Sequence, residues 1–410
     1  MNVLITGAQF GNKGAQSMLF TVMNEVKERY PNADFYYLPL DYFKEELYRD
    51  LDNYRFHFVV DDLAGQDFPA KFGAPQIAWR FFEIRKILRA AKKNGEALAL
   101  SAIWNKLDVL IDVSGYSLTS KFGISSINRV LRMITTAKAH GLKVILLPQS
   151  YGPFEFKEDV RERIGKALKS VDLLFARETD GMEQLRDKCG VTNVLLSPDI
   201  VLQTKEIDWR NVFTREPKLR YPILETTNNV GIVPNGETFR NDRHDSVIRA
   251  YQKMLKTLRE QGKEVYIFRH SNDLPVCREI YDLVKEDSHC HLIEEEIDCL
   301  SYGPFVRQFD FIIASRFHSI VHAYREGIPA LVLGWAIKYE ALTELMKQEQ
   351  YVFDVTAGNE VDEAVLIERL NKMIACSNEE SKVILQNLKT VQENNCFDTC
   401  RSILDSIPQR

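Results

Sequence analysis

The stretch that decides the fold is FDFIIASRFHSIVHAYREGIPALVLGW, residues 309–335. Its first apolar run, 309–314, indicates a buried strand, and residues 317–326 then repeat apolar side chains at helical spacing. Gly327 ends this helix before a second apolar run at 329–334. A strand, a helix and a strand of these lengths predict two parallel strands joined by a crossover helix.

The same alternation runs along most of the chain. In the first half, strands are expected at 2–7, 35–39, 56–60, 107–113, 143–148, 171–176 and 194–197, with helices at 14–30, 125–140 and 157–169. In the second half, strands are expected at 229–234, 263–268, 290–293, 309–314 and 329–334. Between the halves, residues 203–228 are polar, contain prolines and show no period.

This pattern predicts an α/β fold of two Rossmann-like domains that face a cleft. We expect an N-terminal domain over 1–205, a C-terminal domain over 206–380, and a helical tail over 381–410. The C-terminal helices would pack back across the domains.

Composition limits the classes of function. The 410 residues carry a net charge of −5, which gives no overall basic bias toward a nucleic-acid partner. The seven cysteines are scattered and form no CxxC pair, as expected of reduced thiols in the cytoplasm. The chain starts on a strand pattern without a signal peptide, and no run of about 18 apolar residues follows. We therefore expect a cytoplasmic protein.

Residues 77–95, IAWRFFEIRKILRAAKKNG, form a basic amphipathic pattern inserted in the first half. Such a helix can lie in the interface of a bilayer. The alternative is a surface helix whose apolar stripe packs on its own domain while its cations are solvated.

Polar residues follow several strands of the first half, where the functional loops of a parallel sheet lie. The loop GAQFGNKGAQSML at 7–19 has glycines for a tight turn, but it is neither GxGxxG nor a P-loop. Arg177 directly follows the apolar LLFA and therefore needs a carboxylate or a phosphate. An internal ion pair with Glu178 or Asp180 is the alternative. The other strand-end candidates here are Asp112, Ser114, Gln149 and Ser150.

In the second half, Arg316 and His318 stand at a strand's carboxyl end and a helix's amino end. This position suits an anionic ligand, and histidine can move a proton near neutral pH. Two alternatives are a helix-capping histidine beside a salt-bridged arginine, and a metal site. His318 and His322 have the i,i+4 spacing of zinc helices, but no third ligand is evident.

Several motifs together resemble the polysaccharide pyruvyl transferase family. They are GNKGAQSML, PQSYGPF, ARE, SPDIVL, FRHSND and SRFHSIVHAYREGIPALVLGWAIKYEAL, and they span nearly the whole chain in the family's order. The resemblance implies the B architecture of glycosyltransferases, in which two Rossmann-like domains face a cleft. It also implies an enzyme that transfers the enolpyruvyl skeleton of phosphoenolpyruvate to two hydroxyls of a sugar. A cyclic pyruvate ketal forms, and phosphate leaves.

The resemblance also implies site residues. Arg177, Arg316 and His318 would hold phosphoenolpyruvate or act on it, with Phe317 contributing backbone groups. His318 is the expected general acid, whereas Asp112, His270 and Asp273 are all open as the base. The remaining expected substrate contacts are Asn12, Gly14, Asp112, Gln149, Ser150, Asn235, His270 and Lys338. No metal or other cofactor is expected, since arginines can neutralise the phosphate.

The resemblance places the acceptor on the N-terminal domain and the donor on the C-terminal domain. The acceptor would be a lipid-linked or nucleotide-linked sugar of a surface polysaccharide such as a capsule. A lipid-linked acceptor would bring the protein to the inner face of the membrane. Two other functions stay open: a nucleotide-sugar glycosyltransferase and a non-catalytic carbohydrate-binding relative.

Overall fold

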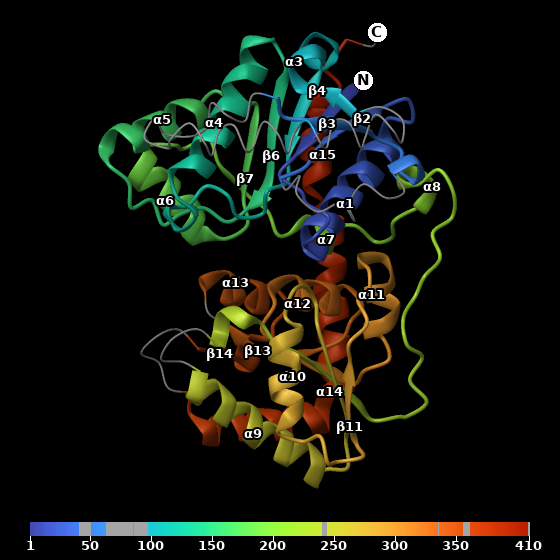
Figure 1. Cartoon of the computed structure of the whole chain (residues 1–410). Helices are drawn as coiled ribbons and strands as arrows, with labels where there is room; N and C mark the ends of the chain where they lie inside the picture. Colours follow the sequence, from blue (N-terminus) through green and yellow to red (C-terminus); the bar gives the residue numbers. More distant parts are fainter. Residues whose placement is uncertain are drawn as a thin grey trace. The chain divides into compact units, whose positions relative to one another are not determined.

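The computed structural model describes residues 1–40, 51–62, 85, 97–239, 244–334, 336–355 and 361–408. The chain forms two compact units (Figure 1). The first comprises Met1–Ile200, Glu206–Pro217 and Asn394–Arg410, and the second comprises Val201–Lys205 and Lys218–Glu393. Each unit is built around its own parallel sheet, so the predicted pair of Rossmann-like α/β units is confirmed.

The sheet of the first unit has eight parallel strands, of which β1 and β5 lie at the centre. In spatial order they are β4 (Ala97–Ala99), β3 (His57–Val60), β2 (Asp34–Leu38), β1 (Asn2–Thr6), β5 (Val109–Asp112), β6 (Lys143–Gln149), β7 (Leu173–Ala176) and β8 (Leu195–Leu196). The order reverses between β1 and β5, which is the topological switch point where such sheets bind ligands. The register pairs Thr6 with Asp112 there.

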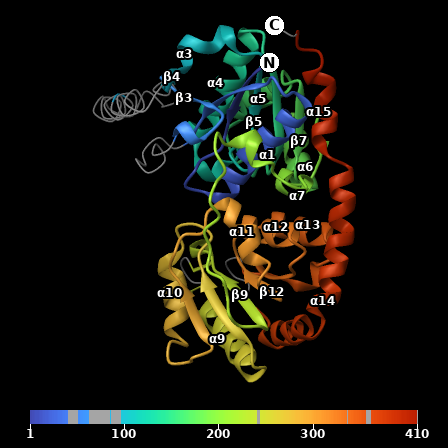
Figure 2. The same cartoon turned by 90° about the vertical axis from the view of Figure 1, so that its right-hand side faces the viewer.

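The helices of the first unit include one at each end of the chain. They are α1 (Lys13–Arg29), α3 (Leu100–Ile103), α4 (Ile124–Ala139), α5 (Glu158–Leu168), α6 (Thr179–Cys189), α8 (Trp209–Val212) and α15 (Cys396–Leu404). Figure 2 shows α15 alongside this sheet, and it packs against β6. Arg29 of α1 pairs with Asp398 of α15 at 3.0 Å, and Tyr30 donates to Asp405 at 2.5 Å. The last helix of the chain is thereby fixed to the first.

The sheet of the second unit has six parallel strands with β9 and β12 at its centre. In spatial order they are β11 (Cys290–Ile293), β10 (Glu264–Phe268), β9 (Asn229–Val233), β12 (Phe311–Ala314), β13 (Ala330–Gly334) and β14 (Val352–Asp354). Numbered within the unit, this is the order 3-2-1-4-5-6 of the Rossmann fold, and its switch point lies between β9 and β12. Arg316 follows β12 at that point.

The helices of the second unit flank its sheet (Figure 1). They are α9 (His244–Glu260), α10 (Leu274–Asp282), α11 (Cys299–Val306), α12 (Phe317–Arg325), α13 (Ile337–Leu345) and α14 (Glu363–Glu393), while α7 (Ile200–Gln203) links the units along the chain. The long α14 packs against α9 and α12. Among the residues that the structure describes, no helix is both long and apolar enough to cross a bilayer.

The basic segment 77–95 lies outside the described residues, apart from residue 85. Its contact with a membrane therefore stays a prediction.

The centre of the second sheet leaves no room for a side chain at Gly231 in β9. A Cβ at this position would lie 2.9 Å from Cε1 of Phe268 and 3.1 Å from Cγ2 of Ile312. The Phe268 ring has little freedom to move, because it is stacked on Phe309 and packed edge-on against Phe305.

We predict that Gly231→Ala lowers the free energy of unfolding by about 1–3 kcal/mol, because it overpacks a filled core. Urea titration of the purified chain measures the effect in the transition of the second unit. Gly236→Ala is the matched control, since its Cβ would meet its nearest atoms at an ordinary 3.6 Å. Equal stability of the two variants would contradict this account of the core.

Candidate functional site

The β12–α12 turn of the second unit is held by bonds to Ser315. The carbonyl of Ser315 accepts from Nδ2 of Asn235 at 3.1 Å and from the hydroxyl of Tyr339 at 2.8 Å. Its side-chain hydroxyl lies 3.2 Å from that of Tyr251. The predicted site residue Asn235 is itself 1% exposed, so its side chain fixes the turn from the interior.

Arg316 follows this turn and forms a bidentate ion pair with Asp273, which lies in the loop after β10. Nε donates to Oδ2 at 2.7 Å, and Nη2 donates to Oδ1 at 2.5 Å. The backbone N–H of Gly236 donates to the same Oδ1 at 3.1 Å. The Asp273 side chain is 2% exposed and that of Arg316 is 29% exposed, so one edge of the guanidinium is buried and the other is accessible.

Helix α12 starts directly after Arg316. The amides of Ser319 and Ile320 donate to the carbonyl of Arg316, and no described side chain caps the helix. The N–H groups of Phe317 and His318 therefore stand at the positive end of the helix. Nζ of Lys338 lies 5.3 Å from the centre of the Phe317 ring, and the centre of the His318 ring lies 5.3 Å from that centre as well. The side chains of His318 and Lys338 thus lie beside the Phe317 ring, and Arg316 precedes Phe317 in the chain.

His270, another predicted substrate contact, lies inside the unit at 1% exposure. Its ring packs edge-on against Tyr302 at 4.9 Å and lies 5.9 Å from the ring of His322. His322 is 3% exposed and belongs to this buried ring cluster. Among the described residues, no three His, Cys, Asp or Glu side chains are placed to hold a metal ion.

At the switch point of the first unit, four donors surround the carboxylate of Asp112. They are the Thr6 hydroxyl at 2.8 Å, the amide and hydroxyl of Ser114 at 3.1 and 3.0 Å, and Nε2 of Gln149 at 3.4 Å. Burial nevertheless raises the pKa of Asp112, although these hydrogen bonds act in the opposite direction.

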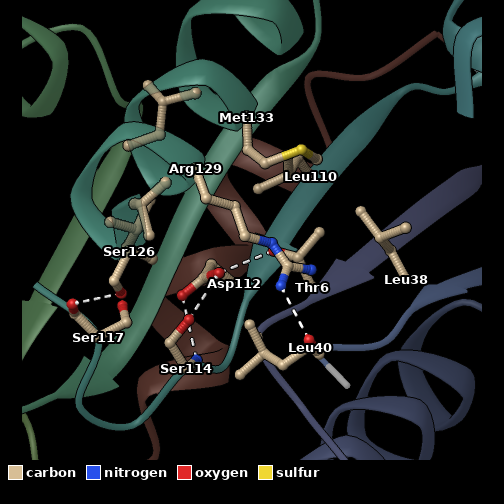
Figure 3. A pocket seen from close by; sticks show the side chains of 14 residues that line it. Thr6, Leu38, Leu40, Leu110, Asp112, Ser114, Ser117, Ser126, Arg129 and Met133 are labelled. Carbon is tan, nitrogen blue, oxygen red and sulfur yellow. Dashed lines mark hydrogen bonds between the residues drawn. The ribbon is translucent and has the colours of Figure 1, made fainter. Parts of the chain in front are cut away.

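Asp112 lines a small cavity at the carboxyl edge of the first sheet (Figure 3). Hydroxyls of Thr6, Ser114, Ser117 and Ser126 line it as well. Arg129 of α4 reaches across the cavity and donates to the carbonyl of Leu40 at 3.1 Å. The volume of about 30 Å³ accommodates one or two water molecules, so it fits a single hydroxyl group of a sugar but not the ring.

Arg177 lies at the same edge but is buried, with 4% of its side chain exposed. Nη1 donates to Asp199 at 2.8 Å, and Nη2 donates to the carbonyl of Gly115 and to the hydroxyl of Ser150, each at 2.8 Å. The structure pairs Arg177 with Asp199, which follows β8 in the chain, whereas the sequence suggested Glu178 or Asp180 as the partner. Ser150 and Gln149 are buried in this same network.

Asn12 and Gly14 form the start of α1. Oδ1 of Asn12 accepts from the amides of Gly14 and Ala15 at 3.0 and 3.3 Å, which makes Asn12 the N-cap of the helix. These two amides are therefore occupied by the chain's own side chain.

Sequence reasoning missed the structural partners of the two arginines. Asp199 belongs to the SPDIVL motif and Asp273 ends the FRHSND motif, so both stood in quoted motifs. From the sequence, Asp273 was predicted only as a candidate base, and no role was predicted for Asp199.

We predict that Asp199→Ala lowers the free energy of unfolding of the first unit by about 3–5 kcal/mol, because it leaves a buried guanidinium without its counter-charge. Replacing both partners, as in Arg177→Met with Asp199→Leu, should recover most of that loss. Chemical denaturation measures all three proteins. Asp187→Ala, which breaks the exposed Arg186–Asp187 pair, is the control and should change stability little. A double variant no more stable than Asp199→Ala would refute the assignment.

The raised pKa of Asp112 predicts how stability depends on pH. The folded state holds this proton more tightly than the unfolded chain, whose aspartates titrate near pH 3.9. Protonated Asp112 therefore stabilises the folded state fully below that pH. This contribution to the free energy of unfolding is lost as the pH rises through the higher pKa of the folded state. The free energy of unfolding of Asp112→Asn should therefore fall less than that of the wild type as the pH rises above about 4. Parallel pH profiles would contradict the raised pKa.

Comparison with known proteins gives the family and the fold type. The family model described as polysaccharide pyruvyl transferase matches residues 12–336, from the N-cap of α1 to the residue before α13. A search of the curated proteins finds no match.

Solved structures similar to this chain include a putative UDP-N-acetylglucosamine 2-epimerase from Listeria monocytogenes (TM-score 0.56, 13% identity, covering 100% of this chain and 98% of that one). Another is UDP-GlcNAc 2-epimerase from Neisseria meningitidis bound to UDP-GlcNAc (TM-score 0.56, 12% identity, covering 99% of this chain and 100% of that one). A third is an S. aureus MnaA–UDP co-structure (TM-score 0.57, 10% identity, covering 100% of this chain and 98% of that one). At such low identity the likeness shows the fold alone, which is of the glycosyltransferase-B type.

Proposed function

Because the chain belongs to the polysaccharide pyruvyl transferase family, we propose that it transfers the enolpyruvyl skeleton of phosphoenolpyruvate to a sugar of a surface-polysaccharide precursor. Two sugar hydroxyls form a cyclic pyruvate ketal, and inorganic phosphate leaves. The observation that carries this proposal is the set of Arg316, His318 and Lys338 at and near the start of α12, which no described side chain caps.

Phosphoenolpyruvate presents a phosphate and a carboxylate, and both fit this group. The accessible edge of Arg316 offers a fork of N–H donors, which matches the spacing of two oxygens on either anion. The amides of Phe317 and His318 add donors at the positive end of the helix. Lys338 supplies a second fixed charge at the Phe317 ring.

Ketal formation requires a proton at the methylene carbon of the donor. In our proposal His318 gives that proton, which leaves an oxocarbenium-like centre at the adjacent carbon. One sugar hydroxyl adds to this carbon and loses its proton. The carbon–oxygen bond to phosphate then breaks, and the second hydroxyl closes the ring. One released proton restores His318, and the other leaves with the phosphate.

In our proposal, Asp112 of the first unit contacts a hydroxyl of the acceptor, and the base that takes the proton is left unassigned. The carboxylate of Asp112 lines a cavity that fits a hydroxyl. All three candidate bases have partners within their own units. Asp112 accepts from Thr6, Ser114 and Gln149, Asp273 accepts from Arg316, and His270 belongs to the buried ring cluster. Arg177, bonded to Asp199 and Ser150, would position the acceptor loops.

The acceptor in this proposal is a lipid-linked or nucleotide-linked sugar. A lipid-linked acceptor would require work at the inner face of the membrane, where the basic segment 77–95 would make contact.

We predict that His318→Asn lowers kcat by about 10²–10⁴, because it removes the proton donor but keeps a side chain of similar polarity. The assay incubates phosphoenolpyruvate with sugar acceptors and records the ketal by mass and the released phosphate. His289→Asn is the control, since His289 lies at the amino end of β11 and bonds to Glu264.

Wild-type kcat in His318→Asn would refute the acid role. Consumption of a nucleotide sugar without phosphoenolpyruvate would favour a glycosyltransferase. Binding of sugars and phosphoenolpyruvate without turnover would favour a carbohydrate-binding relative.

A further inference from the structure

The pairing of Asp273 with Arg316 occupies a defined edge of the guanidinium. An arginine has five N–H donors in one plane, one on Nε and two on each Nη. Asp273 accepts from Nε at 2.7 Å and from Nη2 at 2.5 Å, which is the side edge of the group. Three donors remain, two on Nη1 and one on Nη2, and no described residue accepts from Nη1.

Asp273 is itself fixed from behind. Its side chain is 2% exposed, its Oδ1 also accepts from the amide of Gly236, and its own backbone starts α10. Two parallel hydrogen bonds to a fixed carboxylate determine both the plane of a guanidinium and its rotation within that plane. The remaining edge of Arg316 therefore points in one direction before any ligand binds.

We propose that Asp273 is a positioning residue that fixes Arg316 so that its free edge receives an oxyanion. This inference rests on the proposed function only for the identity of the anion, phosphoenolpyruvate. It also assigns Asp273 a role other than base for the sugar, because both carboxylate oxygens are already used by Arg316.

If only charge mattered, Asp273 would weaken the binding of an anion to Arg316 and would not strengthen it. A carboxylate beside Arg316 cancels its charge and repels an incoming anion, so removing Asp273 without any loss of orientation would tighten anion binding. Asp273 strengthens anion binding only if fixing the orientation of the guanidinium lowers the binding free energy by more than the cancelled charge raises it. The two explanations therefore predict opposite signs for one substitution.

The experiment is a double-substitution cycle on the full-length chain: wild type, Asp273→Ala, Arg316→Ala and the double variant. Calorimetric titration with phosphoenolpyruvate and, separately, with inorganic phosphate gives Kd for each protein. We expect Asp273→Ala to raise Kd about tenfold to a hundredfold in the wild-type background, as for a displaced binding group. In the Arg316→Ala background the same change should leave Kd equal or lower it, because an unpaired, repelling carboxylate is removed.

Two further variants guard the result. Asp273→Asn keeps one acceptor for Arg316 and the acceptor for Gly236, so it should raise Kd less than Asp273→Ala, and it replaces that variant if the latter does not fold. Asp310→Ala is the matched control: it removes a carboxylate paired with Lys263 at 2.8 Å, at the amino edge of the same sheet. It should leave Kd for both anions unchanged.

Weaker binding in both backgrounds would mean that Asp273 serves only stability, and tighter binding in both would mean that only its charge matters. Either result overturns the inference, as does an Arg316→Ala variant that binds both anions like the wild type. The cycle needs no turnover. Suppose that the effect of Asp273→Ala on Kd for phosphoenolpyruvate differs between the two backgrounds as predicted, but that the wild type forms no ketal. This result would refute the proposed function and support the role of Asp273.

Discussion

In a parallel sheet every strand delivers its carboxyl end to the same edge, and this constraint places all the candidate chemistry of the protein. In each unit the two central strands send the chain to opposite sides, which opens the edge between them. β1 and β5 bring Thr6 beside Asp112, and β9 and β12 bring Val233 beside Ala314, one residue before Ser315. The polar residues that follow these strands come together even though about 80–105 residues separate them along the chain.

That edge collects polar groups that must be satisfied, since a buried donor or acceptor without a partner is costly. The first unit meets this demand by internal bonding: Asp112 accepts from Thr6, Ser114 and Gln149, while Arg177 is bonded to Asp199 and two further acceptors. In the second unit, the corresponding hydrogen bonds hold the turn at Ser315 and one edge of Arg316. In the first unit these bonds bury Arg177, whereas in the second unit 29% of the Arg316 side chain stays exposed.

Sequence patterns could predict the strands and the ends at which polar residues cluster, because alternating apolar runs and helical spacing are local properties. They could not predict which polar residues meet. Asp199 lies 22 residues from Arg177, and Asp273 lies 43 residues from Arg316, so each pair depends on strand register and loop path. Asn12 is a different case. Its capping of α1 is a local signal, but the glycines around it suggested an anion-binding loop.

The two arginines of the predicted site differ in burial and in bonding. Sequence treated Arg177 and Arg316 alike, as guanidinium groups that follow a buried strand. Arg177 is 4% exposed and donates to a carboxylate, a carbonyl and a hydroxyl, so an anion could reach it only by displacing Asp199. Arg316 is 29% exposed and keeps an accessible edge of donors, in a plane that a buried carboxylate has already fixed. An anion that binds Arg316 meets a side chain whose orientation is already fixed. Binding therefore costs little conformational entropy, which favours tight and directional binding.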